Sequence, residues 1–590
     1  MPLNELDIPA RKSLGFILIL LCLIVYIPGM GTLPLIDRDE ARYAQASVQM
    51  AQSQDYVNIR FQDQARNKKP AGIYWMQVAG LKIFSDPYRR DIWVHRLPSV
   101  LGAMIAVLAS YWAGIILIGR RAAFYGAALL SVSLLLVFEA HQAKTDAVLA
   151  GLAALEFYLV ARLRQLAHTD QHSSQKPLNP TRDMRLIALG FWAIMGVALM
   201  IKGPVLPGLI FMALLFLFIW EKQASYLRAL SYWLGPVIFI LITLPWLALI
   251  WAETNGQFFR DALGGDFGSK LTSSQEQHGG IVGYYLLTLP IMFWPGSLFL
   301  ICGIAYIITH LRASRQRLSI SNPSEPARYD TVLEIKNLRL LICWVLPAWV
   351  IMELIPTKLP HYPLPLYPAI ALMAGLGVKT VMDKLTFPKI TKFSLLFFIG
   401  VTMVLLGVII YALINYAPLL THKTLLSVVI ILLVGLSMGL TCIAIGRGQG
   451  ERAFFAALLT TVLITPLTYH YIAPNLSGVL ISKQIEDVFT TENIPLTYSG
   501  GPIVVSPHYR EPSLVYRLGT QTLLHMPDDI CEHIKTQPEI VFIFRQDQSG
   551  DMDRLRQCKV ELDILASVSG INYAKGDDLK LDIIYAKPQD

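Results

Sequence analysis

Residues 14–44 read LGFILILLCLIVYIPGMGTLPLIDRDEARYA. Residues 14–30 form an almost unbroken apolar run, and the charged segment 36–40 follows closely. A bilayer core about 30 Å thick needs about 20 mostly apolar residues per helix, so the run predicts a first membrane span. Its one small-x-small candidate, Gly29-Met30-Gly31, lies just before the charges, which favours a retained signal anchor over a cleaved signal peptide.

Apolar stretches of similar length recur as far as Tyr471. Of the 590 residues, 54% are hydrophobic and 16% are charged, against about a quarter charged in an average soluble domain. We therefore predict a multi-pass α-helical membrane protein with about 13 spans. The expected span centres are Leu21, Ala106, Leu130, Gly151, Phe191, Ile210, Ile240, Leu298, Trp349, Ala371, Val401, Ile431 and Leu463.

The loops that follow the even-numbered spans are all basic, from Arg120 and Arg121 to Arg447 and Arg452. Such loops face the cytoplasm, so we expect a cytoplasmic N-terminus and, with an odd number of spans, a periplasmic C-terminus. The net charge of +8 is explained by these loops, and we expect no binding of nucleic acid.

The chain changes character after about Pro474. We predict a transmembrane domain over 1–474 and a periplasmic α/β domain over 475–590, with strands near 502–505 and 540–544. Cys531 and Cys558 both fall in the second domain and could form one disulfide if it is extracytoplasmic. A divalent metal is possible, but no CxxC or Cys/His pattern calls for one.

The first periplasmic loop, about 31–93, is long and strongly charged, although positive charge normally avoids the outer face. It is either a solvated loop that escapes this bias or a surface whose cations bind an anionic ligand at the membrane. Within it, 40–53 and 70–84 have mixed faces compatible with helices that lie along the interface.

Three carboxylates are candidates for chemistry: Asp39 and Glu40 after the first span, and Asp146 at the start of the fourth. Carboxylates from separate helices could converge on one acceptor, where a carboxylate accepts a proton or orients the attacking group. The alternative for Asp39 and for Asp146 is capping of the helix that begins there.

Cations at the same outer face could neutralise a lipid phosphate. Lys68 and Lys69 precede an aromatic segment, and Arg42 lies one helical turn from Asp39. Lys202 and Lys358 lie in short outer turns broken by glycine or proline. Plain anchoring at the interface is the alternative for each lysine. Further polar contacts could come from Tyr43, Lys68, His278, His361 and Tyr362, although His278 could equally be an exposed loop residue.

Five motifs in this order resemble a superfamily of membrane glycosyltransferases, which includes the aminoarabinose transferase of lipid A and the protein O-mannosyltransferases. They are Asp39-Glu40-Ala41-Arg42-Tyr43-Ala44, Lys69-Pro70 with Tyr74-Trp75, Lys144-Thr145-Asp146, Lys202-Gly203-Pro204 and Lys358-Leu359-Pro360-His361-Tyr362. The resemblance covers most of the membrane domain.

The resemblance implies a GT-C fold, a polyprenyl-monophosphate sugar donor and a periplasmic active site in a bacterial inner membrane. Asp39 and Asp146 would be the catalytic or acceptor-orienting carboxylates, and Lys69 and Arg42 would bind the carrier phosphate. One position departs from the pattern, because aminoarabinose transferases tend to have an acidic residue where Lys68 stands here. This departure puts a metal or amino-sugar role for that position in doubt.

We therefore expect an inverting glycosyltransferase that moves an aminoarabinose-type or related sugar to lipid A or another envelope glycolipid. Transfer to protein, as in O-mannosyltransferases, is one alternative. A lipid or sugar transporter is another, but transporters usually place polar sites near the midplane, with paired broken helices in symmetric halves. Neither feature is evident in the sequence.

Overall fold

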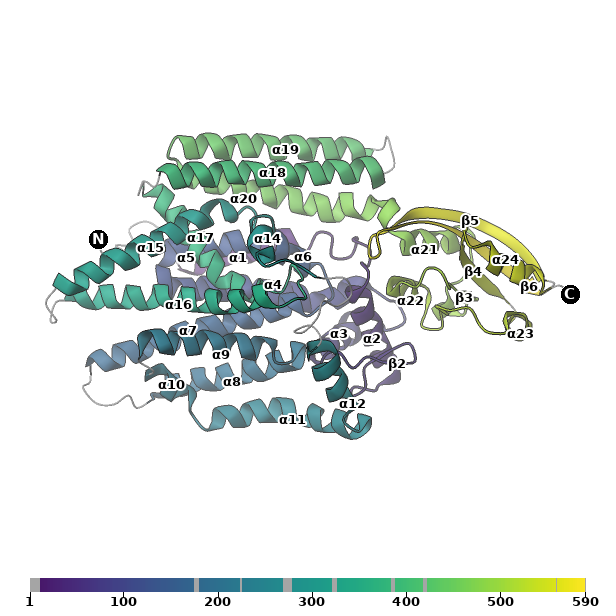
Figure 1. Cartoon of the computed structure of the whole chain (residues 1–590), viewed down its shortest axis with the longest axis horizontal. Helices are drawn as coiled ribbons and strands as arrows, with labels where there is room; N and C mark the ends of the chain where they lie inside the picture. Colours follow the sequence, from purple (N-terminus) through teal and green to yellow (C-terminus); the bar gives the residue numbers. More distant parts are fainter. Residues whose placement is uncertain are drawn as a thin grey trace.

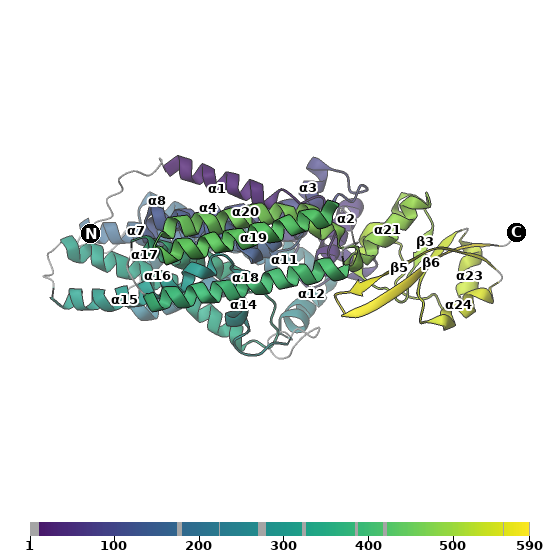
Figure 2. The same cartoon turned by 90° about the horizontal axis from the view of Figure 1, so that it is seen from above.

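The computed structural model describes residues 11–173, 180–222, 225–268, 279–320, 326–383, 388–416, 422–537, 539–558 and 560–588. The chain forms a bundle of long helices with a smaller α/β domain at one end (Figure 1). The view from above also places the N-terminal part of the first loop at the end that carries this domain (Figure 2).

Apolar runs of the sequence become the long helices of the bundle. These are α1 (Arg11–Tyr26), α4 (Ile92–Ile118), α5 (Arg120–Ser131), α6 (Leu134–Ala140), α7 (Asp146–Ser173), α8 (Arg182–Lys202), α9 (Val205–Glu221), α11 (Leu234–Thr254), α15 (Ser297–Ile320), α16 (Pro326–Leu354), α17 (Tyr367–Met382), α18 (Pro388–Tyr416), α19 (His422–Gly446) and α20 (Gly450–Leu467). Shorter elements join them: α10 (Ser225–Leu230), α12 (Gln257–Phe259), η1 (Arg260–Gly268), α14 (Tyr284–Met292) and η2 (Leu364–Leu366).

The chain is a multi-pass membrane protein. Among the described residues, 8 helices are long and apolar enough to cross a bilayer, or 9 if α5 and α6, which are bent by 56° at their junction, form one span. The other predicted centres lie in the shorter apolar segments Ser13–Tyr26 of α1, Val205–Glu221 of α9 and Ile431–Gly446 of α19, and in the more polar α7. Every predicted span centre therefore falls within a helix.

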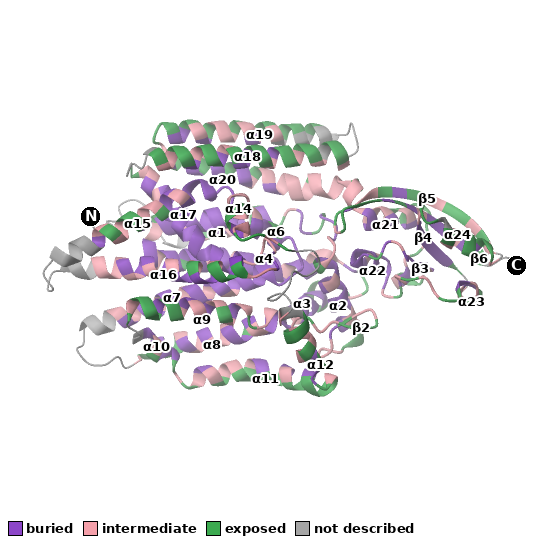
Figure 3. Ribbon diagram, viewed as in Figure 1, coloured by how far each residue is buried: buried purple, intermediate pink, exposed green. Residues whose placement is uncertain are grey.

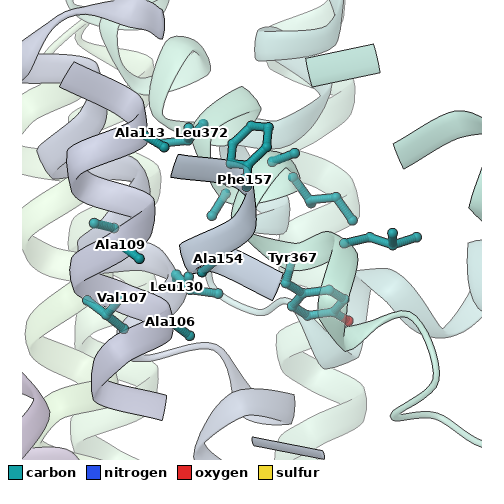
Figure 4. Packing of buried hydrophobic residues seen from close by; sticks show 14 of the residues in the cluster. Ala106, Val107, Ala109, Ala113, Leu130, Ala154, Phe157, Tyr367 and Leu372 are labelled. Atoms are coloured by element: carbon teal, nitrogen blue, oxygen red, sulfur yellow. The ribbon is translucent and has the colours of Figure 1, made fainter. Parts of the chain in front are cut away.

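The centre of the bundle is built from helices that carry small residues on their contact faces. Ala106, Ala109 and Ala113 of α4 lie towards Ala154 of α7 and Leu372 of α17 (Figure 4). Small side chains let helix backbones approach closely, which is how helices cohere in lipid. Helices α18 and α19 are instead mostly exposed or half-buried (Figure 3), as expected for surfaces that face lipid.

Glycine brings some backbones into direct contact. A Cβ atom on Gly303 of α15 would lie 1.8 Å from the carbonyl oxygen of Met373 in α17, and one on Gly377 would lie 1.9 Å from that of Phe299. Since real Cβ atoms do not approach so closely, α15 and α17 can pack this way only with glycine at both positions.

The first loop folds over one end of the bundle. It contains α2 (Asp39–Ser53), a small hairpin of β1 (Arg60–Phe61) and β2 (Gln64–Ala65), and α3 (Gly72–Phe84). Both helices expected in this loop are confirmed. Their apolar faces form a separate core that includes Ala44, Val48, Ile73 and Tyr74.

The C-terminal domain has a four-stranded sheet of order β3-β4-β6-β5, with β3 parallel to β4 and the other pairs antiparallel. Both predicted strands are confirmed, as β3 and β4. Two short elements, η3 (Thr468–Ile472) and η4 (Ala473–Asn475), continue the membrane span of α20. The elements of the C-terminal domain are η5 (Ser477–Val479), α21 (Ile481–Thr491), η6 (Thr497–Ser499), β3 (Ile503–Val505), α22 (Pro512–Leu518), α23 (Ile530–Thr536), β4 (Ile540–Arg545), α24 (Ser549–Arg556), β5 (Val560–Asn572) and β6 (Asp577–Pro588).

Helices cover both faces of this sheet. Apolar residues of α21 and α22 pack on one face with Val541 and Ile543, whereas Ile530 of α23 packs on the other with Phe542. Cys531 and Cys558 are joined by a disulfide with their Cα atoms 5.0 Å apart.

Candidate active site

Asp39 is the first residue of α2, and its side chain remains 53% exposed. Arg42 Nη1 lies 4.0 Å from Asp39 Oδ1, one turn along the same helix. The start of α2 carries no side-chain capping hydrogen bond, so a capping role does not account for this carboxylate. Desolvation by the surrounding protein raises the pKa of Asp39, but Lys144, Arg66 and Arg42 lower it, and the net shift is downward.

Glu40 points the opposite way and is completely buried. Arg96 Nε lies 2.7 Å from its Oε1, and Arg96 Nη2 lies 2.9 Å from its Oε2. The backbone N–H groups of Ile36 and Ala143 also donate to this carboxylate, at 2.9 and 2.8 Å. Glu40 was expected beside Asp39 in the chemistry, but the structure turns it into the protein interior, where it ties three segments together.

Asp146 begins α7, and its carboxylate is 7% exposed. Lys202, the last residue of α8, forms an ion pair with Asp146 Oδ1. His361 Nε2 lies 3.9 Å from the same oxygen, and the hydroxyl of Thr145 is 3.4 Å from Oδ2. Residues predicted from three separate outer segments therefore meet at one point.

Glu139 and Lys144 extend this cluster, and the sequence analysis did not select either as a site residue. Lys144 Nζ lies 3.1 Å from Glu139 Oε1, and His361 Nδ1 lies 3.6 Å from the same oxygen. Among the described residues, the other oxygen of Glu139 has no hydrogen-bond partner. A carboxylate within the apolar run 134–140 is a signal that could have identified it, because ionisable groups at membrane depth usually mark functional sites.

His361 lies at the centre of the cluster in its neutral form. Burial lowers its pKa, and Lys144 and Lys202 lower it further against the opposing effect of Asp146, to about 3. The ring of Tyr362 packs edge-on at 5.3 Å, and the ammonium of Lys202 lies 5.6 Å from the Tyr362 ring centroid. A neutral imidazole between two carboxylates can donate one hydrogen bond and accept another.

The first loop adds a second group of polar side chains. The guanidinium of Arg66 lies 5.2 Å from the ring centroid of Tyr43, and its Nε donates to the hydroxyl of Tyr74 at 3.1 Å. Tyr43 is buried, with the Arg66 guanidinium over its ring. Lys68 is exposed and Lys69 is half-buried, in the turn that leads to α3.

Lys358 does not join the other cations. Its ammonium donates to the backbone carbonyls of Met352, Glu353 and Ile355 at 3.3, 2.7 and 2.7 Å, and the residue is only 4% exposed. Lys358 thus satisfies the free carbonyls at the end of α16, where a cation also complements the helix dipole. In this geometry its ammonium is engaged at the helix end, and its expected role in binding phosphate stays a prediction.

Two further expectations concern His278 and a metal. His278 lies outside the described residues. Within the part of the chain that the structure describes, no group of three or more His, Cys, Asp or Glu side chains is placed to hold a metal ion.

The sequence matches no family model. It is 26% identical over 302 residues to the undecaprenyl phosphate-alpha-4-amino-4-deoxy-L-arabinose arabinosyl transferase of Yersinia pestis, and 26% identical over 351 residues to the protein of the same name from Erwinia tasmaniensis. These matches cover 49% and 58% of this chain and 50% and 55% of the relatives. The chain thus spans about half the length of the curated relatives it matches.

Solved structures agree over more of the chain. ArnT from Cupriavidus metallidurans, bound to undecaprenyl phosphate, superposes with a TM-score of 0.69 and 19% identity, covering 98% of this chain and 100% of that one. The apo oligosaccharyltransferase of Archaeoglobus fulgidus gives 0.52 and 11%, covering 92% and 70%. The fold is therefore the GT-C fold, as the sequence resemblance implied.

Proposed function

We propose that this protein is an inverting glycosyltransferase that moves a sugar from a polyprenyl-phosphate carrier to an envelope glycolipid such as lipid A. The observation that carries the proposal is the exposed, ionised carboxylate of Asp39 beside Arg42, close enough to Lys144 and Arg66 for their charges to act on it. The similarity to relatives named as arabinosyl transferases supports the same reaction class.

The reaction is an in-line displacement at the anomeric carbon. The acceptor oxygen forms a bond to this carbon from one face while the bond to the carrier phosphate breaks on the other. The bonding electron pair leaves on the phosphate oxygen, where Lys69 and Arg42 stabilise the charge that develops. Cations placed before the reaction begins need no reorganisation when the charge appears.

Asp39 orients the acceptor in this scheme. Its lowered pKa makes it a weak base, which suits an acceptor that is already an anion, such as a lipid phosphate. A sugar or serine hydroxyl would instead need a base to take its proton. We propose a phosphate-bearing glycolipid as the acceptor, because its phosphate oxygen needs no deprotonation.

The cluster around Asp146, which includes Lys202 and His361, forms the second part of the proposed site. Lys202 keeps Asp146 ionised and oriented, and neutral His361 and Tyr362 offer hydrogen bonds to sugar or acceptor hydroxyls. The names of the relatives favour an aminoarabinose-type or related donor sugar. Lys68 stands where aminoarabinose transferases tend to have an acidic residue, so this position gives no support for a contact to an amino sugar. Glu40 positions the first loop and takes no part in the chemistry.

The orientation follows from the basic loops of the sequence. We place residues 1–474 as the catalytic domain in the inner membrane, with the site and the domain over 475–590 in the periplasm. The donor's prenyl chain enters between helices, alongside membrane lipids.

The experiment is reconstitution of the full chain in liposomes with radiolabelled undecaprenyl-phosphate sugar and lipid A. We expect wild type to transfer label, with a loss of about a hundred-fold or more for Asp39→Ala and for Lys69→Ala. Asp63→Ala and Lys82→Ala remove the same charges from exposed positions of the same loop and should leave transfer unchanged. Full activity in folded Asp39→Ala and Lys69→Ala would refute the assigned site.

A further inference from the structure

We infer that the C-terminal domain is a positioning element for Asp39, acting through a hydrogen-bonded clamp between Ser513 and Asp37. This inference rests on the proposed function, because it takes Asp39 as the residue that orients the acceptor. It gives a task to a domain that contributes no side chain to the site described above.

The clamp joins two segments far apart in the sequence. The backbone N–H of Ser513 donates to Asp37 Oδ1 at 2.8 Å, and its hydroxyl donates to Asp37 Oδ2 at 2.6 Å. The N–H of Asp37 donates to the hydroxyl of Tyr573 at 2.6 Å. Both carboxylate oxygens and the amide of Asp37 are thus held by the C-terminal domain.

The partner side of the clamp is itself fixed. Ser513 is 1% exposed, and its hydroxyl lies 2.6 Å from the hydroxyl of Ser482 in α21, which in turn lies 2.9 Å from that of Tyr509. This polar network fixes the rotamer of Ser513. Its hydroxyl can therefore hold the Asp37 carboxylate in one position.

Arg38, the next residue, is held by the same domain. Its Nε lies 3.5 Å from Glu511 Oε2, and its Nη2 donates to the carbonyl of Ala574 at 3.2 Å. Glu511 is 3% exposed and accepts a hydrogen bond from Asn572 at 2.8 Å. Two consecutive residues before Asp39 are therefore bound to the C-terminal domain.

The residue after Asp39 is fixed from the other direction, because Glu40 is paired with Arg96 of α4. The segment 37–40 is thus held between the membrane bundle and the C-terminal domain. Asp39 is the exposed carboxylate between two engaged ones, Asp37 and Glu40. The clamp and the buried ion pair together set where Asp39 stands.

A second contact area lies further along α2 and provides a matched control. Gln62 donates to the carbonyls of Thr520 and Thr522 at 2.9 and 2.6 Å, and Gln45 donates to the hydroxyl of Thr520 at 2.8 Å. Gln62 joins the same two parts of the protein as the clamp does, but it lies in the β1–β2 hairpin and not beside Asp39.

The test compares Ser513→Ala and Asp37→Ala with Gln62→Ala in the full chain. A misplacement of about 1 Å in a catalytic group can cost about a hundred-fold in rate, so we expect kcat to fall by about ten-fold to a hundred-fold in the two clamp variants. The KM for the donor should change less than kcat, because Lys69 lies outside the segment 36–44, although Arg42 lies within it. Gln62→Ala should keep the wild-type kcat, and Ser513→Thr, which retains the hydroxyl, should restore most of the rate.

Hydrogen–deuterium exchange provides a measurement that does not depend on transfer. Amides of residues 36–44 should exchange faster in Ser513→Ala than in wild type or Gln62→Ala, whereas those of α3 should not change. If wild type transfers no sugar, the proposed function fails while exchange still decides the clamp. Unchanged exchange in 36–44, or wild-type kcat in both folded clamp variants, would overturn the inference, as would an equal loss of kcat in Gln62→Ala.

Discussion

Glu40 and Arg96 form a two-point ion pair in which both side chains are 0% exposed. The pair joins the segment after the first span to the beginning of α4, and Glu40 also accepts the N–H of Ala143 before α7. Three parts of the chain that enter the site are thereby fixed at one carboxylate. The carboxylate of the neighbouring Asp39 remains exposed beside this buried ion pair.

We predict that Glu40→Gln destabilises the protein strongly. Removing one partner of a buried pair leaves the other charge uncompensated and costs about 3–5 kcal/mol. Thermal unfolding in detergent should show the loss, whereas Asp39→Asn, at an exposed position, should change stability by less than about 0.5 kcal/mol. A stable Glu40→Gln protein that has lost all transfer would instead assign Glu40 to the chemistry.

Lys358→Met should act on stability and not on the donor. The variant leaves the carbonyls of Met352, Glu353 and Ile355 without their ammonium partner, at a cost of about 1–3 kcal/mol. The KM for the donor should not change in the folded fraction, whereas Lys69→Ala should raise it. Donor titrations of the two variants distinguish these roles, and a raised KM in Lys358→Met would return Lys358 to the phosphate site.

Asp37 should make stability depend on pH. Burial raises its pKa from 3.8 to about 6 against the hydrogen bonds from Ser513. Between these values the folded protein binds a proton that the unfolded chain does not, so this contribution is full below pH 3.8 and is lost as pH rises through 6.

Asp37→Asn cannot titrate and isolates the effect from other carboxylates. The difference in unfolding temperature, wild type minus Asp37→Asn, should fall as pH rises from 5 to 7, a window chosen around the pKa of about 6. A difference that stays flat or rises over this window would show that the carboxyl is not held in its protonated form.

The disulfide should stabilise the C-terminal domain without touching transfer. It closes a loop with a sequence separation of 27 residues, which corresponds to about 3.5 kcal/mol in the chain-entropy model. Cys531→Ser with Cys558→Ser should lower the unfolding temperature of the domain. Its kcat should match wild type at temperatures where the domain stays folded, because the bond lies in the core on the sheet face opposite α22. A large loss of kcat at such temperatures would contradict this separation.

The sequence predicted the elements better than their contacts. The lengths of the apolar runs located the spans around centres such as Ala106 and Val401, because the thickness of the bilayer sets the length of a spanning helix. The sequence also brought Asp146, Lys202 and His361 to one face through the alternation of loops. The sequence could not assign partners to the lysines. A lysine in an outer turn gives the same sequence signal whether its ammonium pairs with a carboxylate, as in Lys202, or with carbonyls at a helix end, as in Lys358.

Pairings between distant segments were beyond the reach of sequence patterns. Glu40 and Asp39 are adjacent carboxylates that the sequence cannot tell apart. Only the three-dimensional structure shows that Glu40 pairs with Arg96 in the interior, whereas Asp39 is exposed near Lys144. Ser513 gave no signal at all, because a serine in a short helix of a soluble domain is ordinary until its hydroxyl is found on Asp37.

The glycine contacts between α15 and α17 have a consequence for how this protein varies. Lipid tails are as apolar as leucine side chains, so the bundle gains little free energy when helix contacts replace lipid contacts. The stability of the bundle therefore depends on how closely the helix backbones pack. At Gly303 and Gly377 the two backbones lie so close together that no side-chain carbon fits between them. Any larger residue there acts as a wedge, so we expect these two positions to resist substitution even where the surrounding apolar residues interchange freely.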